Sequence, residues 1–463
     1  MKSLIEIANN VRKGEWKATD MVLEAYAKID ERNGPLNAFI MMDRDRAFAQ
    51  AEKVDAKVAR REDPGALAGV PFAVKDIEDT AGYRTTQGCV FLMDTPPKPN
   101  DSPHVERLKA AGAIVVGKTA TAEFGMDSAV FTKAWGVTRN PWNPETTPGG
   151  SSGGSSAAVA AGMVPFATAT DGGGSIRQPA ANTNLVGLKP SHARIAKFNG
   201  FANWAVHGTV TRTVTEHARY LDVAAGPDDR DRQSLPQVPY KYEEIIETLD
   251  VRGLKAVFTP DCGYAVVEPE VIELARKAAT RLMSAAKLIE KNELFHPTNI
   301  LRDWGALNLG NLEADFIRDG ILPDGLDKLA DTTQFFLNRI RSRRDEIDLK
   351  KSWAQITKLN YEVADFFKSN DLLLSPTTAC KPYRADVTPL QVIDGRDASE
   401  TSVEPFGMLA NACWNPSISI PAGFTADGLP IGLQITARRH RDDILLRLAR
   451  IYEQNYPWTY PWD

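Results

Sequence analysis

Short apolar runs alternate with amphipathic segments along much of this chain. Residues 68–74 (AGVPFAV) and 113–116 (AIVV) are uninterrupted apolar runs, typical of strands buried on both faces. The serine-proline pair at 102–103 and Gly112 bracket a predicted helix between them, because serine caps helix N-termini and proline fits the first turn. Strands that alternate with helices predict an α/β fold, an α/β/α sandwich around a large mixed sheet.

The rest of the chain continues this pattern. Thr19 is placed to cap a helix over 20–28, and a helix over 44–60 follows an extended segment. A polar stretch with prolines at 226–240 predicts a loop, and residues 300–370 predict a variable, mostly helical insert. Further strands are predicted at 254–258, 372–374, 418–420 and 431–435. A short helix is predicted at 155–162 and a last helix at 442–453. Another predicted helix has its apolar residues on one face, at positions 271, 274, 275, 278, 282 and 289.

Composition narrows the class of protein. With 43% hydrophobic and 25% charged residues the chain is typical of globular proteins, and a formal net charge of −5 offers no basic surface for nucleic acid or an anionic membrane. No run approaches 18 apolar residues, and charges precede any apolar stretch at the N-terminus. The four cysteines are scattered and the six histidines lack metal-ligand spacing. We expect a cytoplasmic monomer or homodimer without metal, cofactor, nucleic-acid or membrane partner.

Three polar segments carry the candidate chemistry. Lys75 closes the first apolar run, residues 149–156 read GGSSGGSS, and residues 171–177 read DGGGSIR. Acyl transfer from an amide needs a nucleophile, a base and donors for the oxyanion. Ser175 is the candidate nucleophile, because the glycines before it can bring bare backbone amides close to a carbonyl oxygen. Lys75 can act as a base only if burial lowers its pKa.

In their order, and with Ser151 standing 24 positions before Ser175, these segments resemble the amidase signature family. The resemblance implies that Ser151, after a cis peptide bond from Gly150, relays the proton of Ser175 to Lys75. It also implies an oxyanion hole formed by the amides of Gly172, Gly173, Gly174 and Ser175, with Ser152, Asp171 and Arg177 as structural support. Without the resemblance, Lys75 and the Asp171–Arg177 pair would be taken as surface residues, and the glycine-serine block as a linker.

The resemblance covers nearly the whole chain, including the segments at 415–424 and 428–434. It implies a single domain over 1–463, with N-terminal helices at 1–60, a catalytic core at 61–225, a variable substrate-cover region at 226–400, and C-terminal strands and a helix at 401–463. Residues 150–154 also match the G-x-S-x-G elbow of α/β-hydrolases, but the three prolines at 141–148 exclude the strand that must precede such an elbow.

The function implied is that of a serine hydrolase that cleaves amides, or carbamates (urethanes) or esters, through an acyl-enzyme. The alternative is the glutaminase subunit of a tRNA-dependent amidotransferase, which has the same motifs. Two departures speak against it: Glu404 is the nearest acid where that subunit has an aspartate, and Gly172 stands where it usually has threonine.

Aromatic residues near the motifs suggest an aryl or extended apolar substrate rather than glutamine, with Glu404 as the sole plausible ammonium partner. Taken singly, each of them is more typical of a core-packing residue, and His207 of a satisfied loop histidine. The candidate substrate contacts are Gly125, Met126, Phe131, Phe201, Trp204, His207 and Trp414.

Overall fold

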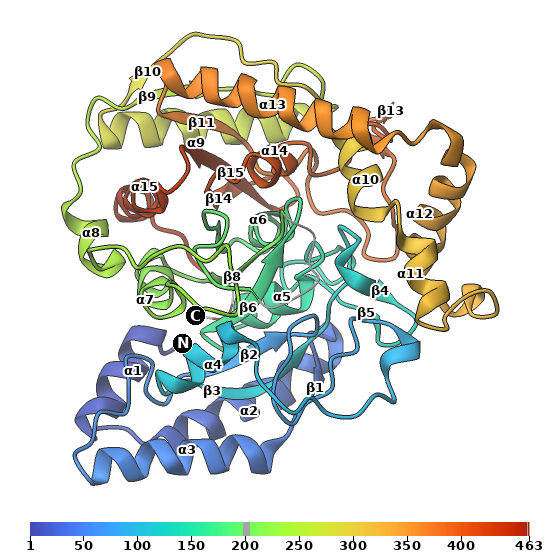
Figure 1. Cartoon of the computed structure of the whole chain (residues 1–463). Coiled ribbons are helices and arrows are strands. Elements are labelled where there is room, and N and C mark those ends of the chain that lie inside the picture. The colour runs from blue at the N-terminus through green and yellow to red at the C-terminus, as the bar shows by residue number, and fades with distance from the viewer. Residues whose placement is uncertain (198–203, 461, 463) are drawn as a thin grey trace.

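One mixed sheet runs through the molecule (Figure 1). In the computed structural model, which describes residues 1–197, 204–460 and 462, this sheet has eleven strands. Their spatial order is β1 (Phe39–Met41), β3 (Ile114–Thr119), β2 (Pro71–Lys75), β6 (Phe166–Asp171), β8 (Val206–Thr211), β7 (Val186–Lys189), β14 (Ser417–Phe424), β15 (Pro430–Ala437), β11 (Leu372–Pro376), β9 (Lys255–Phe258) and β10 (Ile289–Glu290). The expected α/β fold around a large mixed sheet is confirmed.

Parallel strand pairs lie in both halves of the sheet, toward its two edges. β2 runs parallel to β3 and to β6, and β9 runs parallel to β11 and to β10, whereas the strands between these groups pair antiparallel. β2 therefore has a hydrogen-bonded neighbour on each side, and every residue of this strand is buried. Its last residue, Lys75, consequently ends in the interior of the protein rather than at a surface.

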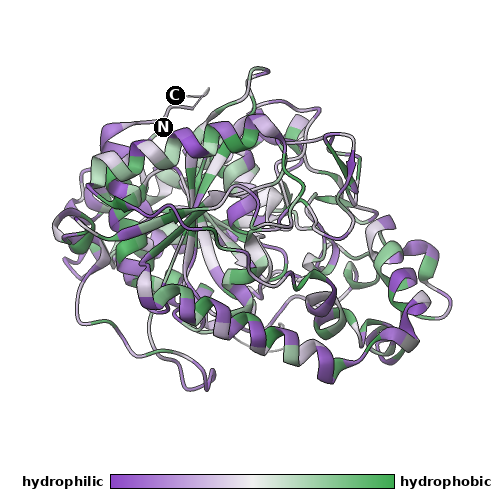
Figure 2. Cartoon of the chain, turned by 90° about the horizontal axis from the view of Figure 1, so that it is seen from above, coloured by the Kyte–Doolittle hydropathy of each residue, from purple (hydrophilic) through white to green (hydrophobic). Residues whose placement is uncertain are grey.

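Helices cover both faces of the sheet. α5 (Gly153–Ala160) and α6 (Arg177–Asn182) pack on one face, and α7 (Val214–Ala224), α9 (Pro269–Ala286) and α15 (Asp442–Asn455) pack on the other. Seen from above, the central strands are largely apolar and the outer helices carry the polar residues (Figure 2). The remaining helices of the core are α1 (Leu4–Lys13), α2 (Ala18–Leu36), α3 (Arg44–Ala59), α4 (Pro103–Ala110), α8 (Tyr242–Thr248) and α14 (Gly407–Ala412).

The predicted insert is a group of helices beside the sheet: α10 (Leu301–Leu309), α11 (Leu312–Arg318), α12 (Asp331–Ser342) and α13 (Leu349–Ser369) (Figure 1). Two acidic residues of the core, the buried Glu123 and the half-buried Asp127, contact its middle. The Glu123 carboxylate accepts the Ala330 amide at 2.8 Å, and Asp127 accepts the Thr332 hydroxyl at 2.6 Å. Two small ribbons complete the structure, β4 (Phe131–Thr132) with β5 (Gly136–Val137), and β12 (Val392–Ile393) with β13 (Arg396–Asp397).

Some element boundaries differ from the sequence prediction. α2 begins at Ala18, not after Thr19, because the distant Asp55 carboxylate accepts the amides of Ala18 and Thr19. Ile289 does not extend the face of α9, since that helix ends in a left-handed Lys287 and Ile289 starts β10. α5 begins at Gly153, two residues before the predicted start. None of the described helices combines the length and the apolar character needed to cross a bilayer.

Candidate active site

Lys75 ends β2 with a fully buried side chain surrounded by hydroxyl groups. Its Nζ donates to the hydroxyl oxygens of Ser151 at 2.7 Å, Ser152 at 2.8 Å and Thr170 at 2.8 Å. Neutral hydroxyls replace water poorly for an ammonium ion. Burial therefore lowers the pKa of Lys75 to about 7, although Asp171, Glu404 and Glu78 pull it upward. About half of these amines are thus unprotonated at neutral pH.

The glycine-serine block reaches Lys75 because its glycines fit against other backbone segments. A Cβ on Gly150 would lie 2.4 Å from the Asp127 carbonyl oxygen, and one on Gly154 would lie 2.5 Å from the amide nitrogen and the carbonyl oxygen of Ala120. The peptide bond between Gly150 and Ser151 is cis, as the resemblance implies. The whole block is buried, so the alternative interpretation as a flexible linker is wrong.

Asp171 and Arg177 form a buried brace around the candidate nucleophile loop. The Asp171 carboxylate accepts the amides of Gly174 at 2.8 Å and Ile176 at 3.1 Å, and pairs with two nitrogens of the Arg177 guanidinium. Arg177 also donates to the side chains of Gln434 and Asn411. Both partners are fully buried, so the interpretation as a surface pair is wrong.

The brace engages one of the four amides expected in the oxyanion hole. The Gly174 amide donates to the Asp171 carboxylate in this structure. The amides of Gly172, Gly173 and Ser175 remain as candidate donors. The carbonyl oxygen of Gly172 accepts the Trp304 indole at 3.0 Å, which ties this end of the loop to α10.

A cavity of about 1060 Å³ opens over these residues. Ser151, Ser175, Gly172 and Gly173 line its inner end, and Gly125 and Met126 line it as predicted. The helical insert, part of the region expected to cover the substrate, supplies much of its wall, although the sequence analysis named none of its residues as substrate contacts. Its apolar lining includes Phe91, Phe124, Trp304, Phe316, Phe335 and Met408.

Four predicted substrate contacts lie elsewhere in the described structure, and Phe201 lies outside the described residues. Trp204 stacks on Trp353 and donates to Asn308, and Trp414 stacks on His192. Phe131 belongs to the β4–β5 ribbon, and His207 faces Glu78. None of these four lines the cavity described above. Packing, the alternative interpretation, fits Phe131 and Trp204 better than substrate contact, whereas Trp414 is 38% exposed. His207 belongs to strand β8 rather than to a loop, and its Nδ1 has no hydrogen-bond partner among the described residues.

Glu404 lines the cavity beside the nucleophile loop. A Cβ on Gly174 would lie 2.6 Å from its Oε2, and within the described residues its Oε1 has no hydrogen-bond partner. Burial raises the pKa of Glu404 to about 8, with Asp171 adding to the effect and Arg177 opposing it. The cavity therefore contains a mostly neutral carboxyl group with free hydrogen-bonding capacity at neutral pH.

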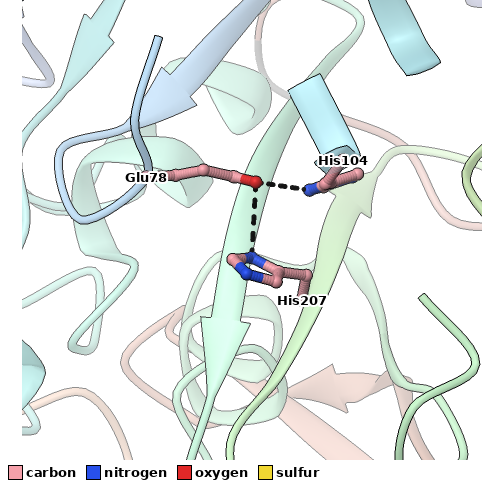
Figure 3. Close-up of side chains that lie close together, drawn as sticks. All are labelled: Glu78, His104 and His207. Carbon is pink, nitrogen blue, oxygen red and sulfur yellow. Dashed lines mark hydrogen bonds and ion pairs between the residues drawn. The ribbon is translucent and has the colours of Figure 1, made fainter. Parts of the chain in front are cut away.

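One group among residues 1–197, 204–460 and 462 could hold a metal ion: Glu78, His104 and His207 (Figure 3). The Glu78 Oε1 lies 2.9 Å from His104 Nδ1 and 3.4 Å from His207 Nδ1. Hydrogen bonds from Ser102 to Glu78, and between Tyr220 and His104, already bind this cluster to its surroundings. These contacts engage Glu78 Oε1 and both nitrogens of His104, whereas Glu78 Oε2 and His207 Nδ1 have no hydrogen-bond partner among the described residues. The absence of a metal stays a prediction.

Comparison with known proteins identifies the family to which this chain belongs. A family model described as Amidase matches residues 20–446. The chain belongs to the amidase family. This amidase is 32% identical to an acylamidase of Rhodococcus erythropolis, over 99% of this chain and 96% of that protein. It is 34% identical to a glutamyl-tRNA(Gln) amidotransferase subunit of Bacillus velezensis, over 97% of this chain and 96% of that protein.

A solved bacterial aryl acylamidase of the amidase signature enzymes has the same fold. It superposes with a TM-score of 0.90 at 28% identity, covering 99% of this chain and 96% of that one. The protein is therefore an amide hydrolase of the amidase signature family. Since the acylamidase and amidotransferase relatives are about equally similar, family membership does not choose the substrate.

Substitutions should separate the roles of the buried groups. Ser175→Ala should abolish covalent labelling by a fluorophosphonate, because the attacking oxygen is gone. Lys75→Ala should lower kcat/KM at least about 100-fold, the usual minimum for loss of a general base. A matched control is Lys189→Met, since burial also lowers the pKa of Lys189 to about 7 but its ammonium donates to the Pro190 carbonyl oxygen outside the cavity. If kcat/KM of Lys75→Ala stayed within about threefold of that of Lys189→Met, Lys75 could not be the general base.

The buried brace should matter for stability. Asp171→Asn leaves the Arg177 charge without its counter-ion, which should lower the free energy of unfolding by about 3–5 kcal/mol. Chemical denaturation measures this change. The control is Asp386→Asn, which breaks an exposed pair with Arg384 and should leave stability nearly unchanged. Equal stability of the two variants would show that the pair contributes nothing as a brace.

Proposed function

We propose that the amidase cleaves neutral amides or carbamates with an aryl or extended apolar group through an acyl-enzyme on Ser175. The observation that carries this proposal is the desolvated Lys75, hydrogen-bonded to Ser151 at the inner end of a largely apolar cavity. A lysine held there by hydroxyls alone is suited to accept a proton, not to pair with an anion.

In the proposed reaction the neutral amine of Lys75 accepts the proton of Ser151 while Ser151 accepts that of Ser175. The Ser175 oxygen forms a bond to the substrate carbonyl carbon, and the amides of Gly172, Gly173 and Ser175 stabilise the oxyanion. The proton then returns through Ser151 to the leaving nitrogen as the carbon–nitrogen bond breaks. A water molecule, activated by the same relay, hydrolyses the resulting ester and restores Ser175.

The cavity wall supports a bulky apolar substrate. Half-buried aromatic side chains of the insert, such as Phe335, face a space large enough for a drug-sized molecule. Three of the arginines that line the cavity are already engaged, because Arg302, Arg339 and Arg343 all contact Glu400. A free carboxylate would have to displace Glu400 to bind them, which disfavours a zwitterionic amino acid.

The alternative, a glutaminase subunit of an amidotransferase, has one specific observation in its favour. Glu404 is a buried carboxyl group whose Oε1 has no hydrogen-bond partner among the described residues, and it lies where an ammonium group of an amino acid could meet it. The similarity to the Bacillus velezensis amidotransferase protein makes this hypothesis worth a direct test.

Comparison of substrates decides between the two. We expect kcat/KM for an acylated nitroaniline to exceed that for glutamine by at least about 100-fold, because glutamine places two charges in a desolvated site. Phe335→Ala should lower kcat/KM for the anilide by about 10–200-fold and affect acetamide less. Tyr361→Ala is the control, since this aromatic on α13 is 71% exposed and lines no part of the cavity. A preference for glutamine would favour the amidotransferase hypothesis.

A further inference from the structure

The chain turns sharply after Lys75, and this turn places the acidic residue Glu78 next to the Lys75 backbone. The Glu78 amide donates to the Lys75 carbonyl oxygen at 3.0 Å, and the Glu78 side chain is buried. Ser102 and His104, at the start of α4, hold its Oε1 at 2.8 Å and 2.9 Å. His207 approaches the same oxygen from β8 at 3.4 Å (Figure 3).

The group formed by Glu78, His104 and His207 is connected to Lys75 through the paired strands β6 and β8. His207 lies directly opposite Thr170 in the β6–β8 pairing, and the Thr170 hydroxyl accepts a hydrogen bond from Lys75 Nζ. Cross-strand neighbours place their Cβ atoms about 4.5–5.5 Å apart. A chain of neighbours therefore links the Glu78 carboxylate to the Lys75 amine through His207 and Thr170.

Two other acidic groups, Asp171 and Glu404, also raise the pKa of Lys75, but the charge of each is reduced by its surroundings. Asp171 is paired with Arg177, and burial keeps Glu404 mostly protonated because its pKa rises to about 8. Burial alone would raise the pKa of Glu78, but the charge interactions with His104 and His207 and the side-chain contacts with His104 and Ser102 outweigh it, and the pKa lies below its ordinary value. The contacts with His104 and Ser102 remain when His207 is neutral. Glu78 is thus ionised whenever Lys75 titrates.

The neighbours of Glu78 do not cancel its charge completely. Burial, with His104 adding to it, lowers the pKa of His207 to about 4, so this imidazole is neutral at pH 7. On β3, Lys118 donates to the Glu78 carbonyl oxygen and also faces Asp76 at 3.5 Å. Tyr220 of α7 contacts His104 on its other nitrogen.

We propose that Glu78 is a positioning residue that acts through Lys75, as a buried counter-charge which Ser102 and His104 hold in place. This inference rests on the proposed role of Lys75 as the base. The carboxylate stabilises the ammonium form and so offsets part of the desolvation that favours the free amine. The effect of Glu78 is to set the pH above which the relay can begin.

The pH dependence of kcat/KM, and of the rate at which phenylmethanesulfonyl fluoride labels Ser175, tests this role. In Glu78→Gln the lost negative charge destabilises the ammonium, lowers the pKa of Lys75 and moves the acid limb of both profiles down by about one pH unit or more. His207→Gln replaces one neutral group by another and should leave the limb in place. Glu216→Gln, the same change at another fully buried carboxyl group, is the control and should also leave it in place.

Three outcomes would overturn the proposal: an unmoved limb in a folded Glu78→Gln variant, equal shifts in all three variants, or a histidine signal showing protonated His207 at pH 7. The last is measured by imidazole NMR of the wild-type protein, assigned with His207→Gln, and decides the question even if Glu78→Gln does not fold. If the wild-type profiles lack an acid limb near pH 7, the role of Lys75 as base fails instead.

Discussion

The desolvation of one ammonium group is the constraint on which this structure depends. Lys75 ends a strand inside the sheet, where three hydroxyl groups take the place of water. These hydroxyls come from two parts of the fold: Ser151 and Ser152 from a backbone that glycines allow to approach closely, and Thr170 from the neighbouring strand β6. Moving any of these segments changes the solvation of the amine and with it the chemistry.

The second constraint is the desolvation of the ion pair that holds the nucleophile loop. Asp171 and Arg177 are both buried, and such a pair is seldom a net gain in stability because desolvation opposes the attraction. What it provides is geometry: the carboxylate accepts two loop amides, and the guanidinium ties the loop to Gln434 of β15 and Asn411 of α14. The brace thus joins the N-terminal and C-terminal halves of the chain at Ser175.

Sequence patterns predicted the local part of the site and missed the part assembled over long distances. Lys75, Ser151 and Asp171 belong to short motifs, and the apolar runs around them predicted the strands correctly. Trp304 and Phe335 were missed because their contact with the site depends on how the insert docks through Glu123 and Asp127. The aromatics at 131, 204 and 414 were nearer in sequence but pack elsewhere, since proximity along a loop does not give direction. The donation of the Gly174 amide to Asp171 was likewise invisible, because the motif does not show where each amide points.

Direct titration of Lys75 tests the central claim. In protein carrying 15N-labelled lysine, the Nζ signal of Lys75, assigned by its loss in Lys75→Ala, should titrate with a midpoint of about 7. An ordinary lysine has a pKa near about 10.4. A midpoint near that value would contradict the account, because Lys75 would then be an ammonium ion throughout the neutral range and could not accept the proton of Ser151.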